Sequence, residues 1–344
     1  MSPVNAFARA LAGDFQRSAL TVLCIVTATA WGAVAWVRAQ EPVPILVVGV
    51  DNGPRAAAES YVLPITAPLD QGDSDLCWVY ATLSMLETNY MTRHPGAHVE
   101  FSRAALQRDS IADRFRRLAN GESGEPSMGG LAVEAIELIR QNGLLDRGDF
   151  HDVKDVDPLI ASLKDALAER AEPLRKEREI DDALARTLGA KPEITHLEGR
   201  PVSPGALGSA VLAGEAWTEF DLSRDGAQGW GPSHDPDARA DTRVRYVTLD
   251  TLIGLIHSSL ARREAVVIGT DDHAMLVYGA DYDRDGRPLA YLIKDSLAPY
   301  LYREDARTLH QELNDVTVAF GGPRPGVAED RRAIDPEAAS RQYP

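Results

Sequence analysis

The chain has 344 residues, enough for one large domain or two small ones, and either arrangement would bury a substantial core. With 44% hydrophobic and 26% charged residues, the composition is that of an ordinary globular protein and excludes a mainly disordered chain. The formal net charge of −16 argues against a nucleic-acid partner, because no excess of basic residues is available to neutralise phosphates.

The N-terminal region contains a long apolar run. The segment Ser18–Val37 has no charged residue and about the length of a membrane-spanning helix. Arg9 and Arg17 precede it and Glu41 follows it, so the positive-inside rule predicts an N-terminus inside the cell and an exported body. We therefore expect a cytoplasmic N-terminus at 1–17 and a single-pass anchor at 18–38 in a bacterial-type inner membrane.

A cleavable signal peptide is the alternative for the same segment. The letters VRA before Gln40 offer small residues where signal peptidase requires them, which would leave a periplasmic or secreted protein. The apolar run is longer than the usual signal-peptide core, and this length favours the anchor. A proline- and glycine-containing linker is expected at 39–62, a folded domain at 63–325 and a C-terminal tail at 326–344.

Cys77 lies at the start of a predicted helix whose apolar residues Val79, Leu83 and Leu86 recur at helical spacing. The other cysteine, Cys24, is inside the hydrophobic segment, so the exported part has one thiol. One thiol cannot form an internal disulfide or a zinc-finger type site. Two interpretations remain open here, a buried cysteine acting as a small hydrophobe or a nucleophile.

The predicted first turn of this helix favours a thiolate, because free backbone N–H groups and the helix dipole stabilise an anion there. Ser74 or Asp75 is expected to cap the helix.

The later elements predict an α+β protein. MGGLAVEAIELIRQNGLL (128–145) is a second amphipathic helix with Asn142-Gly143 as its stop. The charged stretch at 151–200 predicts surface helices, as part of a helical insertion at about 151–240 that is either a lid or a solvated helix pair. A helix at 249–264 is followed by short apolar strands at 265–269, 273–279 and 289–295. Helices first and strands later are typical of α+β and not of an alternating doubly wound sheet.

His273 stands out among the eight histidines, because it follows a polar turn and opens an apolar strand. Asp295 ends a neighbouring strand in the same kind of position. Two polar groups at adjacent strand ends can meet, so Asp295 is a candidate partner for His273 and both are candidate partners for Cys77.

The order of these motifs resembles the papain-like cysteine peptidases. Gln71-Gly72 precedes Cys77-Trp78, His273-Ala274 opens a strand, and Lys294-Asp295-Ser296 stands where that family has Lys-Asn-Ser-Trp-Gly. The long hairpin HAMLVYGADYDRDGRPLAYLIKDS is most similar to the bleomycin hydrolase branch. The resemblance covers about 63–150 and 245–300 and leaves the charged insertion unmatched.

The resemblance implies a two-lobed fold, with a helical lobe that presents the cysteine helix and an antiparallel, β-barrel-like lobe that presents His273 and Asp295. Cys77 would be the nucleophile, His273 the acid/base and Asp295 the group that orients the imidazole. Gln71 would donate its side-chain amide to the oxyanion, together with the backbone N–H of Cys77. The substrate would be a peptide or protein, hydrolysed through a thioester without any cofactor or metal.

Gly129 and Gly130 are similar to the Gly-Gly segment that borders the substrate cleft of the family, and the resemblance makes them candidate substrate-binding residues. The loop GWGPSHDPDARAD (229–241) could line the same cleft, although the sequence suggests no mechanism for it.

The chain departs from the family pattern at three places. Asp295 replaces an asparagine, which should stabilise the imidazolium form of His273 and shift the pH profile. Leu297 replaces a tryptophan that shields the histidine hydrogen bond, and Ser74 stands where secreted members have a disulfide cysteine. No prodomain fits between the anchor and Leu63, so control by a propeptide of the usual form is not expected.

Two alternatives to a peptidase stay open. A papain-fold binding or scaffolding module with little activity would fit the changes at Asp295 and Leu297, and a thiol transamidase would use an amine in place of water. The sequence does not indicate an oligomeric state.

The motif DYDRDG, Asp281–Gly286, matches the opening of a calcium loop, but Leu292 stands where the full pattern needs a glutamate. A polar hairpin turn between two strands is the preferred interpretation.

Overall fold

The computed structural model describes residues 57, 59–122, 128–150, 156–168, 173–271, 273–297 and 300–320. The predicted anchor at 18–38, the N-terminus at 1–17 and the tail at 326–344 lie outside these residues. Within the described residues, no helix is long and apolar enough to cross a membrane.

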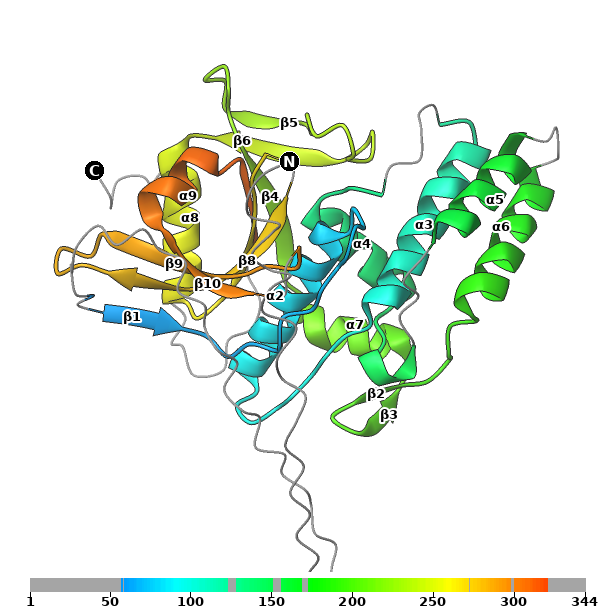
Figure 1. Ribbon diagram of the computed structural model, residues 1–344, viewed down its shortest axis with the longest axis horizontal. Coiled ribbons are helices and arrows are strands. Elements are labelled where there is room, and N and C mark those ends of the chain that lie inside the picture. The colour runs from blue at the N-terminus through cyan, green and yellow to red at the C-terminus, as the bar shows by residue number, and fades with distance from the viewer. Residues whose placement is uncertain are drawn as a thin grey trace, which may run out of the picture. The chain divides into compact units, whose positions relative to one another are not determined.

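Helices and strands follow one another in the order expected for an α+β chain (Figure 1). The α-helices are α2 (Cys77–Arg93), α3 (Arg103–Ala119), α4 (Ala132–Asn142), α5 (Asp157–Ala168), α6 (Pro173–Leu188), α7 (Pro204–Leu212), α8 (Leu249–Ala261) and α9 (Ala306–Glu312). A short 3₁₀ helix, η1, covers Arg147–Asp149. The strands are β1 (Glu59–Val62), β2 (Thr195–Leu197), β3 (Arg200–Val202), β4 (Ala216–Leu222), β5 (Gly229–Pro232), β6 (Arg243–Val247), β7 (Val266–Gly269), β8 (Ala274–Tyr282), β9 (Pro288–Lys294), β10 (Leu301–Asp305) and β11 (Asp315–Phe320).

The large sheet follows the order β10-β9-β8-β7-β11-β4-β6-β5, and β1 pairs with β8 beside this path. Its strand pairs are antiparallel except β4 and β6, which run parallel. The prediction of an antiparallel lobe is wrong for this one strand pair. The connection from β4 to β6 passes through β5, which pairs antiparallel with β6, so β6 enters the sheet in the direction of β4.

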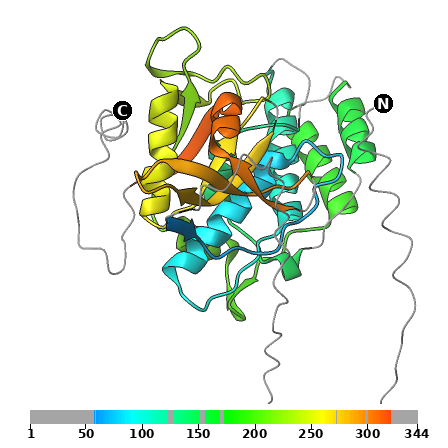
Figure 2. The same ribbon diagram turned by 60° about the vertical axis from the view of Figure 1, so that its left-hand side comes forward.

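Helix α2 lies between the sheet and helices α3, α4 and α7, whereas α8 and α9 pack on the strands (Figures 1 and 2). It contacts β8 and β7 on one side and α3, α4 and α7 on the other. This position explains why nearly every face of α2 is buried, with Trp78, Val79, Leu83 and Met85 almost fully inaccessible. The sequence prediction of a helix buried on most sides is confirmed.

The predicted cap of α2 is wrong. The N-cap residue is Leu76, and no side chain caps the helix. The hydroxyl of Ser74 instead donates to the carbonyl of Gln71, at 2.7 Å, within the loop that precedes the helix. The first N–H groups of α2 therefore have no side-chain acceptor of their own.

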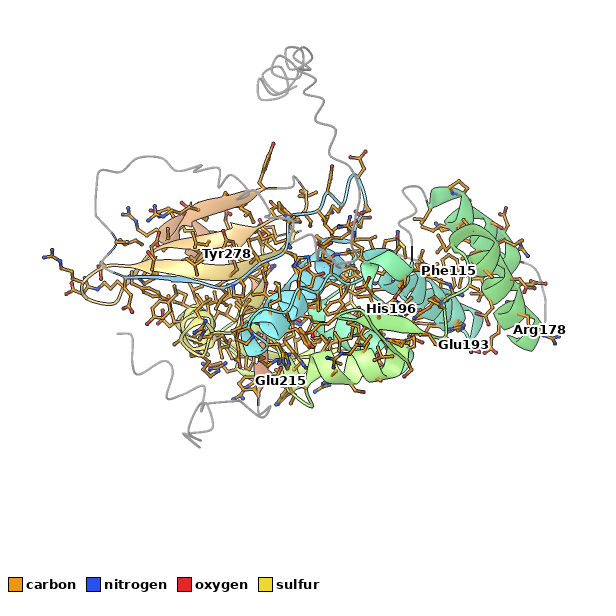
Figure 3. The ribbon with its side chains drawn as sticks, turned by 90° about the horizontal axis from the view of Figure 1, so that it is seen from below. Phe115, Arg178, Glu193, His196, Glu215 and Tyr278 are labelled. Atoms are coloured by element: carbon orange, nitrogen blue, oxygen red, sulfur yellow. The ribbon has the colours of Figure 1, made fainter. Side chains whose placement is uncertain are left out.

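The charged stretch after residue 156 forms the helix pair α5 and α6, which packs on α3 through a second apolar core. Phe115 of α3 is buried there, beside α5 and α6, whereas Tyr278 lies inside the sheet (Figure 3). The predicted helical insertion at 151–240 differs from the structure beyond Leu188, because β4 and β5 belong to the large sheet. The helix pair thus enlarges the helical part of the molecule.

Candidate active site

Cys77 is the first residue of α2 and is half-buried. The backbone N–H groups of Val79 and Tyr80 donate to the carbonyl of the N-cap residue Leu76, at 2.9 and 3.1 Å, and the helix dipole places positive potential at this end. No acidic residue stands in the first turn to oppose that potential. The position therefore places the Cys77 sulfur in the positive potential of a helix N-terminus.

His273 and Asp295 meet at one edge of the sheet. His273 comes directly before β8 and Asp295 directly after β9, and the two strands pair antiparallel with Leu276 opposite Lys294. Antiparallel pairing brings the start of one strand beside the end of the other. The imidazole Nε2 of His273 lies 2.7 Å from Oδ1 of Asp295, and the Cys77 side chain also interacts with the same ring.

The electrostatics of this trio favour an imidazolium. Burial alone would lower the pKa of His273, but its interactions with Asp295 and Cys77 outweigh burial and raise the pKa to about 9. Burial would raise the pKa of Asp295, but the bond from His273 and the backbone N–H of Leu297 hold this pKa below its ordinary value. At neutral pH the pair is a carboxylate and a cationic imidazole.

Gln71 is anchored beside the catalytic candidates by the residue that follows Asp295. Its backbone N–H donates to the carbonyl of Ser296 at 2.8 Å, and its side-chain oxygen accepts from the Ser296 hydroxyl at 2.6 Å. Its amide nitrogen donates to the carbonyl of Ser74 at 2.5 Å. These bonds fix the orientation of the amide, whose nitrogen lies on the loop directly before Cys77 with one N–H donated to Ser74 and one N–H left as a further donor. Ser296 belongs to the Lys294-Asp295-Ser296 motif, but the motif alone did not indicate this role for it.

Gly129 and Gly130 lie next to Trp78, the residue that follows Cys77. The indole N–H of Trp78 donates to the carbonyl of Met128 at 2.9 Å, and a Cβ on Gly130 would meet the Trp78 ring at 3.1 Å. Gly129 itself is buried, because the Asp237 side chain covers it. The structure thus brings the glycine pair to the Cys77–Trp78 region, with one glycine covered by the 229–241 loop.

A buried ionic network that no sequence pattern indicated lies beside Asp295. Glu87 of α2, fully inaccessible, forms an ion pair with Arg103 of α3 and accepts from the hydroxyl of Thr66 at 2.6 Å. Thr66 in turn accepts from Lys294 at 2.8 Å, the residue before Asp295. Burial lowers the pKa of Lys294 to about 8 despite the nearby Glu87 carboxylate. The network connects α2, α3 and the end of β9.

A group of acidic side chains lies between the start of α4 and the sheet. Burial raises the pKa of both Glu219 and Asp315. The Asp315 charge adds to the rise at Glu219, and the Asp221 charge adds to the rise at Asp315. Burial, with the Glu219 charge added, also raises the pKa of Asp221 to about 7. Asp315 packs against Gly269 at the end of β7, close to the loop that carries His273.

The described residues contain no group of three or more His, Cys, Asp or Glu side chains arranged to hold a metal ion. The DYDRDG motif forms the hairpin turn between β8 and β9, where the N–H of Asp283 donates to the carbonyl of Arg287 at 2.9 Å. The carboxylate of Asp281 binds Arg303 at 2.5 Å and the hydroxyl of Ser60. The hairpin interpretation is confirmed, and Asp281, the first acidic residue of the motif, forms an ion pair with the Arg303 guanidinium.

Helices on one side of a central helix and a large sheet on the other define an α+β architecture of the papain-like type. No protein-family model and no curated protein sequence matches the chain.

Solved structures share the fold at low sequence identity. The crystal structure of PepW from Lactobacillus rhamnosis HN001 is 14% identical with a TM-score of 0.59, and the match covers 77% of this chain and 82% of that chain. Procathepsin L 3 of Tenebrio molitor larval midgut is 12% identical with a TM-score of 0.37, covering 79% and 72%. Xylellain, a cysteine protease from Xylella fastidiosa, is 12% identical with a TM-score of 0.35, covering 78% and 88%. The fold assignment rests on the PepW structure, because the other two TM-scores are too low to carry an argument.

Proposed function

We propose that the chain is a papain-like thiol peptidase in which Cys77, His273 and Asp295 act as a catalytic triad. The observation that carries the proposal is a single imidazole that is hydrogen-bonded to Asp295 and whose pKa is raised by both Asp295 and Cys77. A nucleophile at a helix N-terminus, a base within reach and a third group that orients the base are the components of nucleophilic acyl transfer.

The chemistry follows from these positions. The Cys77 thiolate attacks the peptide carbonyl carbon, and the negative charge moves to the carbonyl oxygen. The amide N–H of Gln71 and the backbone N–H of Cys77 stabilise that oxyanion. The Nε2–H of His273 is held by Asp295, so Nδ1 is the nitrogen that donates a proton to the leaving amine. Water, deprotonated by the same nitrogen, then hydrolyses the thioester and restores the thiol.

Chemical labelling of the full chain tests the proposal. Iodoacetamide and the epoxide E-64 should modify Cys77 at neutral pH much faster than Cys24, and the Cys77→Ala variant should lose this modification. A matched His273→Asn variant keeps the thiol but removes the base, so its Cys77 should be modified slowly by both reagents. Equal labelling of Cys77 in the wild type and in His273→Asn contradicts the triad, and would favour a papain-fold binding or scaffolding module.

A transamidase uses the same thioester but a different acceptor. Mass analysis of peptide products with and without added primary amines separates the two reactions. Products that carry the amine in large excess over hydrolysed peptide would favour transamidation.

We also propose that the domain is exported and held at the membrane by residues 18–38, supported by the absence of charged residues from Ser18 to Val37. Within papain-like folds, the resemblance of residues 273–296 supports the bleomycin hydrolase branch. N-terminal sequencing of the protein from membrane and soluble fractions tests the anchor. A mature N-terminus at Gln40 would refute it.

A further inference from the structure

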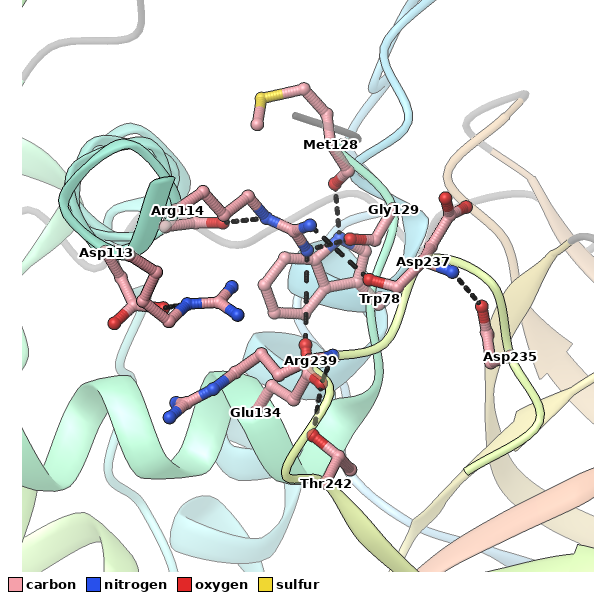
Figure 4. Close-up of polar contacts among 12 residues, drawn as sticks. Trp78, Asp113, Arg114, Met128, Gly129, Glu134, Asp235, Asp237, Arg239 and Thr242 are labelled. Carbon is pink, nitrogen blue, oxygen red and sulfur yellow. Dashed lines mark hydrogen bonds and ion pairs between the residues drawn. The ribbon is translucent and has the colours of Figure 1, made fainter. Parts of the chain in front are cut away.

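A loop of the sheet is fastened across the helical part of the molecule, at the glycine pair beside the active site. Residues 233–242, here called the strap, connect β5 and β6 and reach α3 and α4 (Figure 4). The carboxylate of Glu134 in α4 accepts the backbone N–H of Arg239 and the hydroxyl of Thr242, each at 2.6 Å. Glu134 is only 4% exposed, so the strap is anchored in the interior.

Arg114 of α3 is a second anchor and joins the strap to the glycine pair. Its guanidinium donates to the carbonyl of Asp237 at 3.4 Å and to the carbonyl of Gly129. It also lies 4.0 Å from the Glu134 carboxylate and over the Trp78 ring. The strap, Gly129 and the Trp78 ring of α2 are therefore in contact with one buried cation.

The side chain of Asp237 occupies the space above Gly129. A Cβ placed on Gly129 would lie 2.2 Å from Oδ2 of Asp237 and 2.7 Å from its Cγ, distances that exclude any further atom. Under the proposed function Gly129 and Gly130 border the substrate cleft, so a peptide that extends along the Met128–Gly130 segment would have to enter this space. Gly130 contacts the ring of Trp78, so the blocked position is beside the residue that follows Cys77.

We propose that the strap occludes the cleft at Gly129 and restricts the site to peptides too short to extend past Asp237. This inference rests on the proposed function, because it assigns a substrate class to the same site. Short peptides and chain ends reach Cys77, whereas a long extended chain has to displace the strap from Glu134 and Arg114. Asp237 is thus a specificity-determining residue, and Glu134 and Thr242 are positioning residues.

The test compares reagents of different length on the full chain. Iodoacetamide reaches Cys77 without occupying the cleft, whereas a tetrapeptide vinyl sulfone has to lie along it. Asp237→Ala removes the carboxylate above Gly129. Asp241→Ala is the matched control, because it removes the same charge from the same strap at a side chain that is 75% exposed. Thr242→Val removes one anchor bond at nearly constant volume.

We expect the tetrapeptide reagent to label Asp237→Ala at least about tenfold faster than wild type, Thr242→Val by a smaller factor, and Asp241→Ala at the wild-type rate. Iodoacetamide should label all four proteins alike. Equal tetrapeptide rates in wild type and Asp237→Ala overturn the occlusion.

Failure of the thiol chemistry is recognised separately. If iodoacetamide does not select Cys77 in the wild type, the proposed function fails, and binding replaces labelling as the readout. Fluorescein-labelled casein, a long extended substrate, is titrated by anisotropy against Cys77→Ala with and without Asp237→Ala. Tighter binding to the double variant, and not to the Cys77→Ala/Asp241→Ala pair, supports the strap. Equal affinities overturn it.

Discussion

The charge of Asp295 on His273 leads to a prediction that separates this site from one with an asparagine. The substitution Asp295→Asn keeps an oxygen that can accept from the imidazole Nε2–H but removes the negative charge. The structure places the two side chains 2.7 Å apart, and they are only 11% and 16% exposed. The loss of the Asp295 charge should therefore strongly reduce the stabilisation of the His273 imidazolium.

The magnitude follows from the pKa of His273, which is raised from 6.5 to about 9 although burial opposes the rise. Such an increase corresponds to roughly 2–3 kcal/mol in favour of the imidazolium, after allowance for solvent screening at a partly open site. A neutral hydrogen bond retains about 1 kcal/mol of this. We therefore expect Asp295→Asn to move the alkaline limb of the pH–rate profile toward neutral pH by about one pH unit or more.

Stability supplies an independent readout that needs no substrate. The folded-state pKa of His273 lies above the unfolded value, so its contribution is complete below pH 6.5 and disappears as the pH rises through about 9. The folded-state pKa of Asp295 is lowered from 3.8, so its contribution is present above pH 3.8 and is lost as the pH falls through the folded value. The difference in Tm between wild type and Asp295→Asn should therefore be largest between about pH 3.8 and pH 6.5, where both contributions are complete.

Both measurements need a control of matched chemistry. Asp285→Asn makes the same change on the β8–β9 turn, where the carboxylate is 71% exposed. It should alter neither the pH–rate profile nor the pH dependence of Tm. The reasoning is refuted if Asp295→Asn leaves the alkaline limb in place, or if its Tm difference from wild type is the same at about pH 5 as at about pH 10.

Three further changes test other parts of the site. Gln71→Ala removes an oxyanion donor and should lower kcat about 100-fold with little change in KM or in the rate of Cys77 labelling by iodoacetamide; a change in KM alone would contradict that role. Leu297→Trp places a ring where the side chain is now 55% exposed, so the alkaline limb should become less sensitive to added salt, and an unchanged salt dependence would argue against shielding. Glu87→Gln leaves Arg103 buried without its counter-charge and should cost about 3–5 kcal/mol in urea unfolding, whereas the exposed Glu137→Gln should cost almost nothing.

The parts of the fold that depend on local patterns could be predicted from the sequence. Helix α4 ends at Asn142, and Gly143 adopts a φ of 75° as the predicted stop requires. The apolar runs that predicted three strands form β7, β8 and β9 with ends shifted by at most a few residues. The contact between His273 and Asp295 follows from the same information, because the two residues flank consecutive strands that pair.

Features that depend on the convergence of distant segments could not be predicted. The parallel pairing of β4 with β6 needs a crossing of the sheet that no local period specifies. Glu87 has the pattern of a polar position on a helix, and the sequence does not show that Arg103 and Thr66 meet it. The composition of residues 229–241 predicts a loop. It does not show that the strap is attached to Glu134, a residue about a hundred positions earlier in the chain.

The two chain segments that flank the proposed reaction centre are joined directly. Gln71 precedes Cys77, Ser296 follows Asp295, and two hydrogen bonds of 2.8 and 2.6 Å hold them together. The segments that carry Gln71 and Asp295 are therefore fixed to one another as well as to their own elements. Because α2 also packs on β8, the distance from Cys77 to His273 is set by a helix–sheet contact in the core. The substitution at Leu297 leaves these connections intact, so its effect should fall on solvent access to the imidazole and not on the geometry of the triad.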